Sequence, residues 1–588
     1  MENKYEWKLS DIYKSKEDFE KDKESLNKKL EEIVKYKGSL EDSSDNIYNY
    51  YKLYEEIVEI ICKLYSYGML RYHKNMADSK GISIFKEVQA LDSNIDEVTA
   101  FAVPELTEMD TEKLKKYLNE DKRLEAYSKT INDIIESKKH ILSKDVEEVL
   151  AKFSNVLIGY KNTYEIFTNT EINFTPIKDE DGNLVEINED SAGKYLNSPN
   201  REVRKATHHS LVSEYQKYIN TLTELYLNNV KQDTKIANLR NYKSSLEKAV
   251  DNDEASVKVY DTLLKTVNEN LNINHRYTSL KKKLLNVDEL HMYDMNYNPF
   301  SSKSSLTDIE TAEKEVLEAL KPMGKEYVSK IEEAFNSNWM DVYPSPNKMG
   351  SAYNMNSYGV HPYVLMNYTG TNFDVSSIAH EFGHAMHSYY SSKNQNALNY
   401  SYSKLLAEMA STINEILFAE YKIKSTEDKE TKKELLYNRI NTVRATLMAQ
   451  TMLAEFEKEI HSKVEKGENL NSEIIGNYYL ELNKKYYGDS LTIDEYNKNN
   501  WIRITHFFRN FYVYTYATGI SCSIDIASRI LNKEDGLVEK YIDMLKLGGS
   551  KKPLEILKTV GIDLEDKKIY ENALKFYEND INELEKLI

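Results

Sequence analysis

The sequence predicts a mainly α-helical protein with one small β-region. Nine prolines and nineteen glycines are few for 588 residues, and long stretches are rich in Glu, Lys and Leu, which favour helices. The apolar share of 40% can form a substantial core, although a chain of this length is too long for one simple core. No repeat or low-complexity linker divides it, so we expect helical segments packed into a two-lobed body.

Three segments can be distinguished along the chain. Residues 1–110 predict an N-terminal helical lobe. Residues 111–195 continue as helix and then carry two short apolar stretches around Asp181 and Gly182, which are the turn residues of a β-hairpin. Residues 196–588 form the third and largest segment.

The small β-region is expected between residues 343 and 366, where Gly, Pro and Asn mark turns between short apolar stretches. We expect Ser351, Ala352 and Tyr353 to lie on an edge strand, where an extended peptide can add backbone hydrogen bonds. His361 follows a glycine turn, and it either contacts such a ligand or caps the turn.

The stretch 380–384 reads His-Glu-Phe-Gly-His, a pattern that can hold one metal ion. Residues i and i+4 of a helix lie on the same face, so His380 and His384 can bind one ion between them. Glu381 lies about 100° round the helix, where it can act as a general base toward a metal-bound water. With twelve histidines in the chain, this pattern can also arise by chance.

The surrounding residues favour a helix from Asp374 to Ser388, which would lie next to the small β-region. Asp374 is a good N-cap residue, and Ile378 and Phe382 supply apolar positions at helical spacing. Gly383 costs about 1 kcal/mol relative to Ala inside a helix. We therefore expect backbone or substrate to come close to Gly383.

A third metal ligand is expected on the next helix, because two histidines leave the ion short of protein donors. The run from Leu405 to Ser411 is strongly helical, and its apolar residues would bury Glu408 on the inner face. An unpaired buried carboxylate costs several kcal/mol, so a metal ion is a suitable partner. Glu415 falls on the same face and is expected to accept a hydrogen bond from a ligating histidine. Alternatively, both glutamates are solvated helix residues.

These stretches together resemble the thimet-oligopeptidase (M3) superfamily of zinc metallopeptidases and, within it, oligoendopeptidase F. The resemblance rests first on the 380–384 motif combined with Glu-Met-Ala-Ser at 408–411. Further stretches extend it over nearly the whole chain: WKLSDIY at 7–13, ANLRNY at 237–242, DELHMYD at 288–294, HPYVLMNY at 361–368 and HFFRNFYVYTYATG at 506–519. The chain departs from the family pattern in three places. The family reads Ser-Gly-Ala-Tyr where Gly350 here precedes Ser351. Thr505 replaces a common proline, and Phe508 replaces a common tyrosine.

The last of these stretches offers hydrogen-bond donors. Peptide hydrolysis passes through an oxyanion, and aimed donors are worth about 3–4 kcal/mol there. The resemblance assigns His506 and tyrosines of the block to substrate and transition-state contacts. The following residues favour a helix, in which Tyr512 and Tyr516 align at i,i+4 while Tyr514 points elsewhere. Alternatively, the block is a tyrosine-rich core helix.

The resemblance implies a zincin-like endopeptidase with a deep substrate channel. One Zn²⁺ would be held by the two motif histidines and Glu408, and residues 196–588 would be the catalytic domain. Residues 111–195 would be the segment typical of the oligopeptidase F N-terminus. The substrates would be short unstructured peptides cut at internal bonds.

The amino-acid composition limits the kinds of partner that the protein is expected to bind. A formal charge of −18 argues against nucleic acid, since phosphate contacts need clustered Lys and Arg. No long uncharged apolar run occurs and the first residues lack an apolar signal region, so we expect a cytoplasmic protein without a membrane partner. Two cysteines exclude a disulfide framework and a cysteine zinc site. The oligomeric state is left open.

Two other functions are compatible with parts of the sequence. A metal-dependent hydrolase acting on a non-peptide amide would use the same motif. A helical peptide-binding protein without activity would need a broken site, yet His380, Glu381, His384 and Glu408 are all present.

Overall fold

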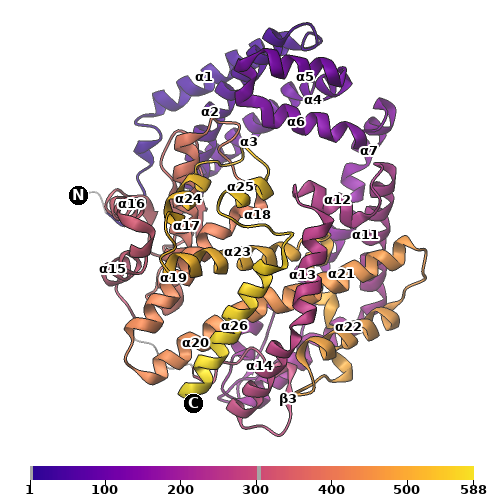
Figure 1. Ribbon diagram of the computed structural model, residues 1–588, viewed down its shortest axis with the longest axis vertical. Helices are drawn as coiled ribbons and strands as arrows, with labels where there is room; N and C mark the ends of the chain where they lie inside the picture. The colour runs from indigo at the N-terminus through magenta and orange to yellow at the C-terminus, as the bar shows by residue number, and fades with distance from the viewer. Residues whose placement is uncertain (1–3, 301–305) are drawn as a thin grey trace. The chain divides into compact units, whose positions relative to one another are not determined.

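The computed structural model describes residues 4–300 and 306–588, and helices make up most of its regular structure (Figure 1). The predicted fold class, mainly α with small sheets, is confirmed. The chain divides into two compact units, each built from three separate stretches. Unit 1 comprises Met1–Lys139, Ser304–Tyr421 and Ile526–Ile562, and unit 2 comprises His140–Lys303, Lys422–Asp525 and Asp563–Ile588. The segment boundaries expected near residues 110 and 195 stay a prediction.

Unit 1 contains an N-terminal group of helices and a second group around a small sheet. The first group is α1 (Lys16–Ile33), α2 (Ser44–Lys74), α3 (Ser79–Thr99), α4 (Ala102–Glu108), α5 (Thr111–Glu120) and α6 (Ser128–Ser137). The second is α15 (Ile309–Ala319), α16 (Gly324–Asn336), α17 (Asn372–Asn394), α18 (Lys404–Ala407), the start of α19 (Met409–Ser425), the end of α23 (Tyr514–Leu531), α24 (Leu537–Leu545) and α25 (Pro553–Thr559).

The sheet of unit 1 has three strands, β4 (Met340–Asp341), β5 (Tyr353–Met355) and β6 (Tyr363–Leu365). Their order is β4-β6-β5, with β4 parallel and β5 antiparallel to β6, so β5 is an edge strand. Tyr363 and Leu365 of β6 are buried against Leu70 of α2 and against Trp7, which precedes α1. This small core joins the sheet to the N-terminal helices.

Unit 2 is built around long helices. They are α7 (Lys144–Leu157), α8 (Gly159–Ile166), α9 (Glu189–Leu196), α10 (Arg201–Lys217), α11 (Ile219–Leu239), α12 (Ser245–Asn252), α13 (Val257–Glu269), α14 (Leu271–Leu285), α20 (Lys429–Val443), α21 (Gln450–Glu465), α22 (Ser472–Tyr487) and α26 (Lys567–Leu587). Its strands form two pairs, β1 (Ile177–Lys178) with β2 (Leu184–Val185), and β3 (Leu290–His291) with β7 (Leu491–Thr492).

The hairpin predicted from Asp181 and Gly182 is present. β1 and β2 pair antiparallel, and Gly182 adopts a φ of 83°, which glycine reaches without steric cost. Each strand is only two residues long, shorter than the apolar stretches suggested. Among the described residues, no helix combines the length and the apolar character needed to cross a membrane.

Candidate active site

The predicted metal helix is α17, which begins two residues earlier than expected. Thr371 is the N-cap, and its hydroxyl accepts from the Asp374 amide at 3.2 Å. The Asp374 carboxylate accepts in return from the Thr371 amide at 3.1 Å, so this residue closes a capping box from the third helical position and is not the cap itself. Ile378 and Phe382 face the core of unit 1 and are fully buried.

Gly383 lies where the backbone of α19 crosses α17. A Cβ atom at Gly383 would lie 2.4 Å from the Ala410 carbonyl oxygen and 2.5 Å from Cα of Ser411. Asn414, one turn further along α19, donates to the Ala379 carbonyl of α17 at 3.1 Å. The close approach expected at Gly383 is therefore confirmed, and the neighbour is backbone.

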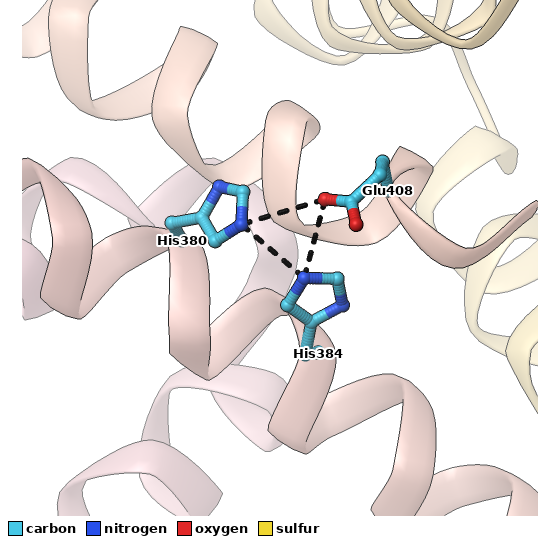
Figure 2. A group of neighbouring side chains, drawn as sticks. All are labelled: His380, His384 and Glu408. Atoms are coloured by element: carbon cyan, nitrogen blue, oxygen red, sulfur yellow. Dashed lines mark hydrogen bonds and ion pairs between the residues drawn. The ribbon is translucent and has the colours of Figure 1, made fainter. Parts of the chain in front are cut away.

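This crossing brings three potential metal ligands together (Figure 2). The Nε2 atoms of His380 and His384 are 3.2 Å apart. Oε2 of Glu408 lies 3.5 Å from the first and 3.4 Å from the second. The three donor atoms form a nearly equilateral triangle.

The triangle has the dimensions of a tetrahedral zinc site. Zinc binds histidine nitrogen and carboxylate oxygen at about 2.0–2.2 Å, which makes the edge between two ligands about 3.3–3.5 Å. The observed edges run from 3.2 to 3.5 Å. Two imidazoles and one carboxylate are also a ligand set that zinc uses in catalytic sites.

Glu408 is less buried than the sequence suggested. It was expected on the inner face of a continuous helix, but it lies at the break between α18 and α19, and 59% of its side chain is exposed. One carboxylate oxygen faces the two histidines. Hydrogen bonding to His384 lowers the pKa of Glu408, so the carboxylate is charged and able to bind a cation.

Glu415 lies behind His380. Its Oε2 is 3.4 Å from Nδ1 of His380, on the side of the ring opposite the other donors. Burial lowers the pKa of His380, but the hydrogen bond to Glu415 and the neighbouring carboxylates outweigh it and raise the pKa overall. A carboxylate at Nδ1 holds the proton there and leaves the Nε2 lone pair for a metal.

Glu381 is a buried carboxylate next to the three donors. Only 6% of the residue is exposed, and its Oε2 has no hydrogen-bond partner among the described residues. Burial raises the pKa of Glu381, against the opposing effect of the two histidines. A buried oxygen without a partner is costly unless something binds there, which suits a residue that contacts a substrate water.

Comparison with known proteins decides the family. The profile of Peptidase family M3 matches residues 194–576, and the profile named Oligopeptidase F matches residues 105–174. Oligopeptidase PepF of Bacillus subtilis (strain 168) is 37% identical over 583 residues, covering 99% of this chain and 87% of that protein. The chain belongs to peptidase family M3. The M3 resemblance inferred from the sequence is thus confirmed, and the protein is a metalloendopeptidase.

Further relatives support this. The Oligoendopeptidase F homolog of Lactococcus lactis subsp. lactis (strain IL1403) is 32% identical, covering 100% of this chain and 97% of that protein. The crystal structure of oligoendopeptidase-F from Enterococcus faecium superposes with a TM-score of 0.73 at 29% identity, covering 97% of this chain and 99% of that chain. A solved structure from Chlamydophila abortus reaches a TM-score of 0.93 at 30% identity, covering 100% of this chain and 98% of that chain.

In this M3 peptidase the C-terminal block lies in unit 2 and gathers three of the predicted residues. Nε2 of His506 is 3.2 Å from the Tyr516 hydroxyl. The Tyr512 ring stacks against His506 with centroids 5.8 Å apart and meets Tyr516 edge-on at 5.2 Å. Burial and the charge of Arg509 lower the pKa of His506, which favours the neutral imidazole.

The helix expected through this block starts later than predicted. α23 begins at Tyr514, so Tyr512 lies in the preceding turn and not one helical turn before Tyr516. Phe511 breaks the helix with a φ of 57°, which is rare for an aromatic residue. Tyr514 is fully buried and bonds Asp253 at 3.1 Å. Tyr512 and Tyr516 still meet, by a turn and not by helical spacing.

The edge strand begins after two of the residues assigned to it. Ser351 and Ala352 precede β5 and are exposed, and Tyr353 is its first residue. The Tyr353 hydroxyl bonds His73 of α2 at 2.8 Å. Asn354 donates to Ser388 of α17 at 3.1 Å, so the strand lies beside the metal helix.

His361 has partners within unit 1 on both ring nitrogens. Its Nδ1 lies 2.7 Å from the Pro362 carbonyl, and its Nε2 lies 3.4 Å from Asp11. The ring stacks on Trp339 with centroids 4.9 Å apart. This arrangement suits the turn-capping alternative, and substrate contact by His361 stays a prediction.

Three supporting residues were not singled out from the sequence. His387 is buried one turn beyond His384 and stacks on Tyr402 at 3.6 Å. Arg509 places its guanidinium 3.6 Å from the centre of the Tyr512 ring. Two of the three could have been found from the sequence. His387 stands seven residues after His380, on the same helical face, and Arg509 is a cation inside an aromatic run. Nothing local indicates Tyr402.

Proposed function

We propose that this M3 peptidase is a zinc-dependent endopeptidase that cleaves short unstructured peptides, with one zinc ion held by His380, His384 and Glu408. The proposal is carried by the triangle of donor atoms, with edges of 3.2 to 3.5 Å, next to a buried carboxylate. When bound there, zinc lowers the pKa of a water molecule to about 7 and polarises the substrate carbonyl.

Glu381 is proposed as the general base, and its burial beside the two histidines and Glu408 supports this role. It takes a proton from the attacking water and passes it to the nitrogen of the leaving amine, so the same group acts as base and then as acid. Burial at 6% exposure keeps bulk water away from this carboxylate. Glu415 orients His380 through Nδ1, at 3.4 Å.

His506, Tyr512 and Tyr516 are proposed as donors to the oxyanion and the substrate. The hydroxyl of Tyr516 and Nε2 of His506 lie 3.2 Å apart, so both can point at one substrate oxygen. The neutral imidazole favoured by the lowered pKa of His506 can carry its proton on Nε2 and donate from there.

Substrate recognition is proposed to involve the backbone at 351–353 and β5, which has a strand partner on one side only. An extended peptide can add backbone hydrogen bonds along such an edge with little demand on its side chains. The names of the relatives, oligopeptidase and oligoendopeptidase F, support short peptides as substrates. A cytoplasmic location is supported by two free cysteines, Cys62 and Cys522.

The test compares two variants in which zinc content and turnover are measured together. Glu381→Gln should keep one equivalent of zinc and lose peptide hydrolysis by about 10²–10⁴-fold, since general-base catalysis contributes that much. His384→Ala should lose both zinc and activity. A zinc-replete Glu381→Gln protein with near-normal turnover would refute the role of the base, and full zinc retention in His384→Ala would refute the ligand set.

A further inference from the structure

Three cationic side chains are buried close to one another in unit 2. Arg204 of α10, Lys281 of α14 and Arg444 are all buried. Arg444 opens a short π-helix, η8 (Arg444–Ala449), which joins α20 to α21. The groups that act on the charge of Lys281 include Arg444, Arg204 and the carboxylate of Asp294.

The carboxylate of Asp294 is already occupied. It accepts from Arg204 at 2.9 Å and from Arg201 at 2.8 Å. A single negative charge that already faces two guanidinium groups cannot also neutralise a third cation. Asp294 therefore neutralises at most one buried cation of the group.

Lys281 needs no counter-ion. Its Nζ donates to the carbonyl oxygens of Met295 and Tyr297 at 2.6 and 3.0 Å, and it also contacts the hydroxyl of Tyr437. Burial and the charge of Arg444 lower the pKa of Lys281 well below its usual value. An amine surrounded by neutral polar groups in this way is stable without charge.

Arg444 differs, because a guanidinium stays charged in proteins. Its hydrogen bonds are long and run to neutral groups: Nε donates to Asn441 at 3.4 Å, and Nη1 donates to the Tyr487 hydroxyl at 3.5 Å. The residues that act most on its charge are tyrosines. Among the described residues, no carboxylate lies within ion-pair distance of it.

A neighbouring arginine shows what a compensated site looks like here. Arg439 of α20 is also buried, and its Nε and Nη2 donate to the two oxygens of Asp580 at 2.8 and 2.6 Å. A buried charge without such a partner costs several kcal/mol. By contrast, the hydrogen bonds of Arg444 run to neutral groups alone, so its buried charge is not balanced by a carboxylate of the described residues.

We propose that Arg444 and Tyr487 form a binding site for a small inorganic monoanion of the size of chloride. The guanidinium supplies the charge, and the Tyr487 hydroxyl, which accepts from Arg444, has its own proton available to donate. Arg444 is 7% exposed and Tyr487 is 5% exposed, so an anion beside them must lose its hydration water, which costs less for a small monoanion than for phosphate. The site is independent of the zinc centre and serves the stability of unit 2.

The test follows the melting temperature of the full-length protein in sodium chloride against sodium gluconate at equal ionic strength. Chloride should raise the Tm in a saturable way, by about 1–3 °C, because a ligand that binds only the folded state stabilises it. Gluconate is too bulky to enter. Equal melting temperatures in the two salts would overturn the proposal.

Two variants separate this site from a general salt effect. Arg444→Met should abolish the chloride response and should melt no lower than wild type in gluconate, since it removes an unpaired buried charge. Arg439→Met should melt lower, because it leaves Asp580 buried without its partner, yet should keep the chloride response. A chloride response retained in Arg444→Met would refute the site.

Crystals of the wild-type protein soaked in sodium bromide provide a direct measurement that needs no variant. An anomalous peak within contact distance of the Arg444 guanidinium is expected. Its absence, with water alone beside the guanidinium, would overturn the proposal even if the variants fail to fold.

Discussion

Gly383 of α17 and Ser411 of α19 come so close that a methyl group on the glycine would lie 2.5 Å from Cα of the serine. Glu408 stands three residues before Ser411, and His380 and His384 flank Gly383 along α17. The distance between these two backbones therefore sets the distance between the histidines and the third ligand. A residue without chemistry of its own therefore controls the geometry of the proposed metal site.

Gly383→Ala should weaken zinc binding. The added Cβ atom would meet the Ala410 carbonyl oxygen at 2.4 Å, so α19 must move and carry Glu408 away from the histidines. Overpacking of this kind costs about 1–3 kcal/mol, which corresponds to a loss of about 5–150-fold in zinc affinity if it falls on the metal site. Zinc affinity can be measured by competition with a chelator.

The matched control for this variant is Gly193→Ala in α9, where nothing lies within 4 Å of the added atom. That change should leave zinc affinity unaltered and stabilise the helix by about 0.5–1 kcal/mol. Unchanged zinc affinity in Gly383→Ala would show that α19 can move without taking Glu408 with it.

Tyr516→Phe should lower kcat by about 10²–10³-fold with little change in KM, as expected for a donor that acts on the transition state alone. Tyr514→Phe is the control from the same block. Tyr514 is buried and bonds Asp253 at 3.1 Å, so its loss should cost about 1 kcal/mol of stability and leave kcat intact. Both variants are compared by steady-state kinetics and thermal melting. A loss of kcat in Tyr514→Phe with normal turnover in Tyr516→Phe would assign the oxyanion donor to Tyr514.

Glu457→Gln should change how stability depends on pH. Glu457 is fully buried, and its Oε1 accepts from the Phe511 amide at 2.6 Å, which holds the turn before Tyr512. Burial raises the pKa of Glu457 well above its usual value, with a further rise from Asp233. The group is neutral when folded and ionises when unfolded, so its stabilisation is complete below about pH 4.3 and is lost as pH rises toward the folded pKa.

The Tm of Glu457→Gln minus that of wild type should therefore increase between about pH 4 and 7, because glutamine keeps the acceptor oxygen and cannot ionise. Glu473→Gln, at an exposed position on α22, should melt in parallel with wild type. Parallel curves for Glu457→Gln as well would mean that Glu457 ionises in the folded protein.

The preference for short unstructured peptides is tested with a ladder of peptides of increasing length and with a folded protein. Internal cleavage of the shorter peptides is expected, with loose sequence preference, because an edge strand such as β5 recognises backbone. Mass spectrometry of the products gives the sites and the size limit. Efficient cutting of the folded protein, or release of single terminal residues only, would contradict the proposal.

The sequence by itself determined the features that depend on local spacing. The i,i+4 separation of His380 and His384 places both on one helix face whatever the rest of the chain does, and low Pro and Gly content favours helices everywhere. The β-hairpin at Gly182 is likewise a local matter, since its turn requires a positive φ. These are properties of residues close together in the chain.

Only the tertiary structure decided how distant segments face one another. Glu408 was expected to be buried on a continuous helix, but the crossing at Gly383 places it at a helix break with one oxygen toward the histidines. Tyr512 meets Tyr516 because Phe511 holds a left-handed turn that Glu457, 54 residues earlier, stabilises. Helical periodicity extends over a few residues, whereas these positions depend on packing between segments far apart in the chain, which no local pattern encodes.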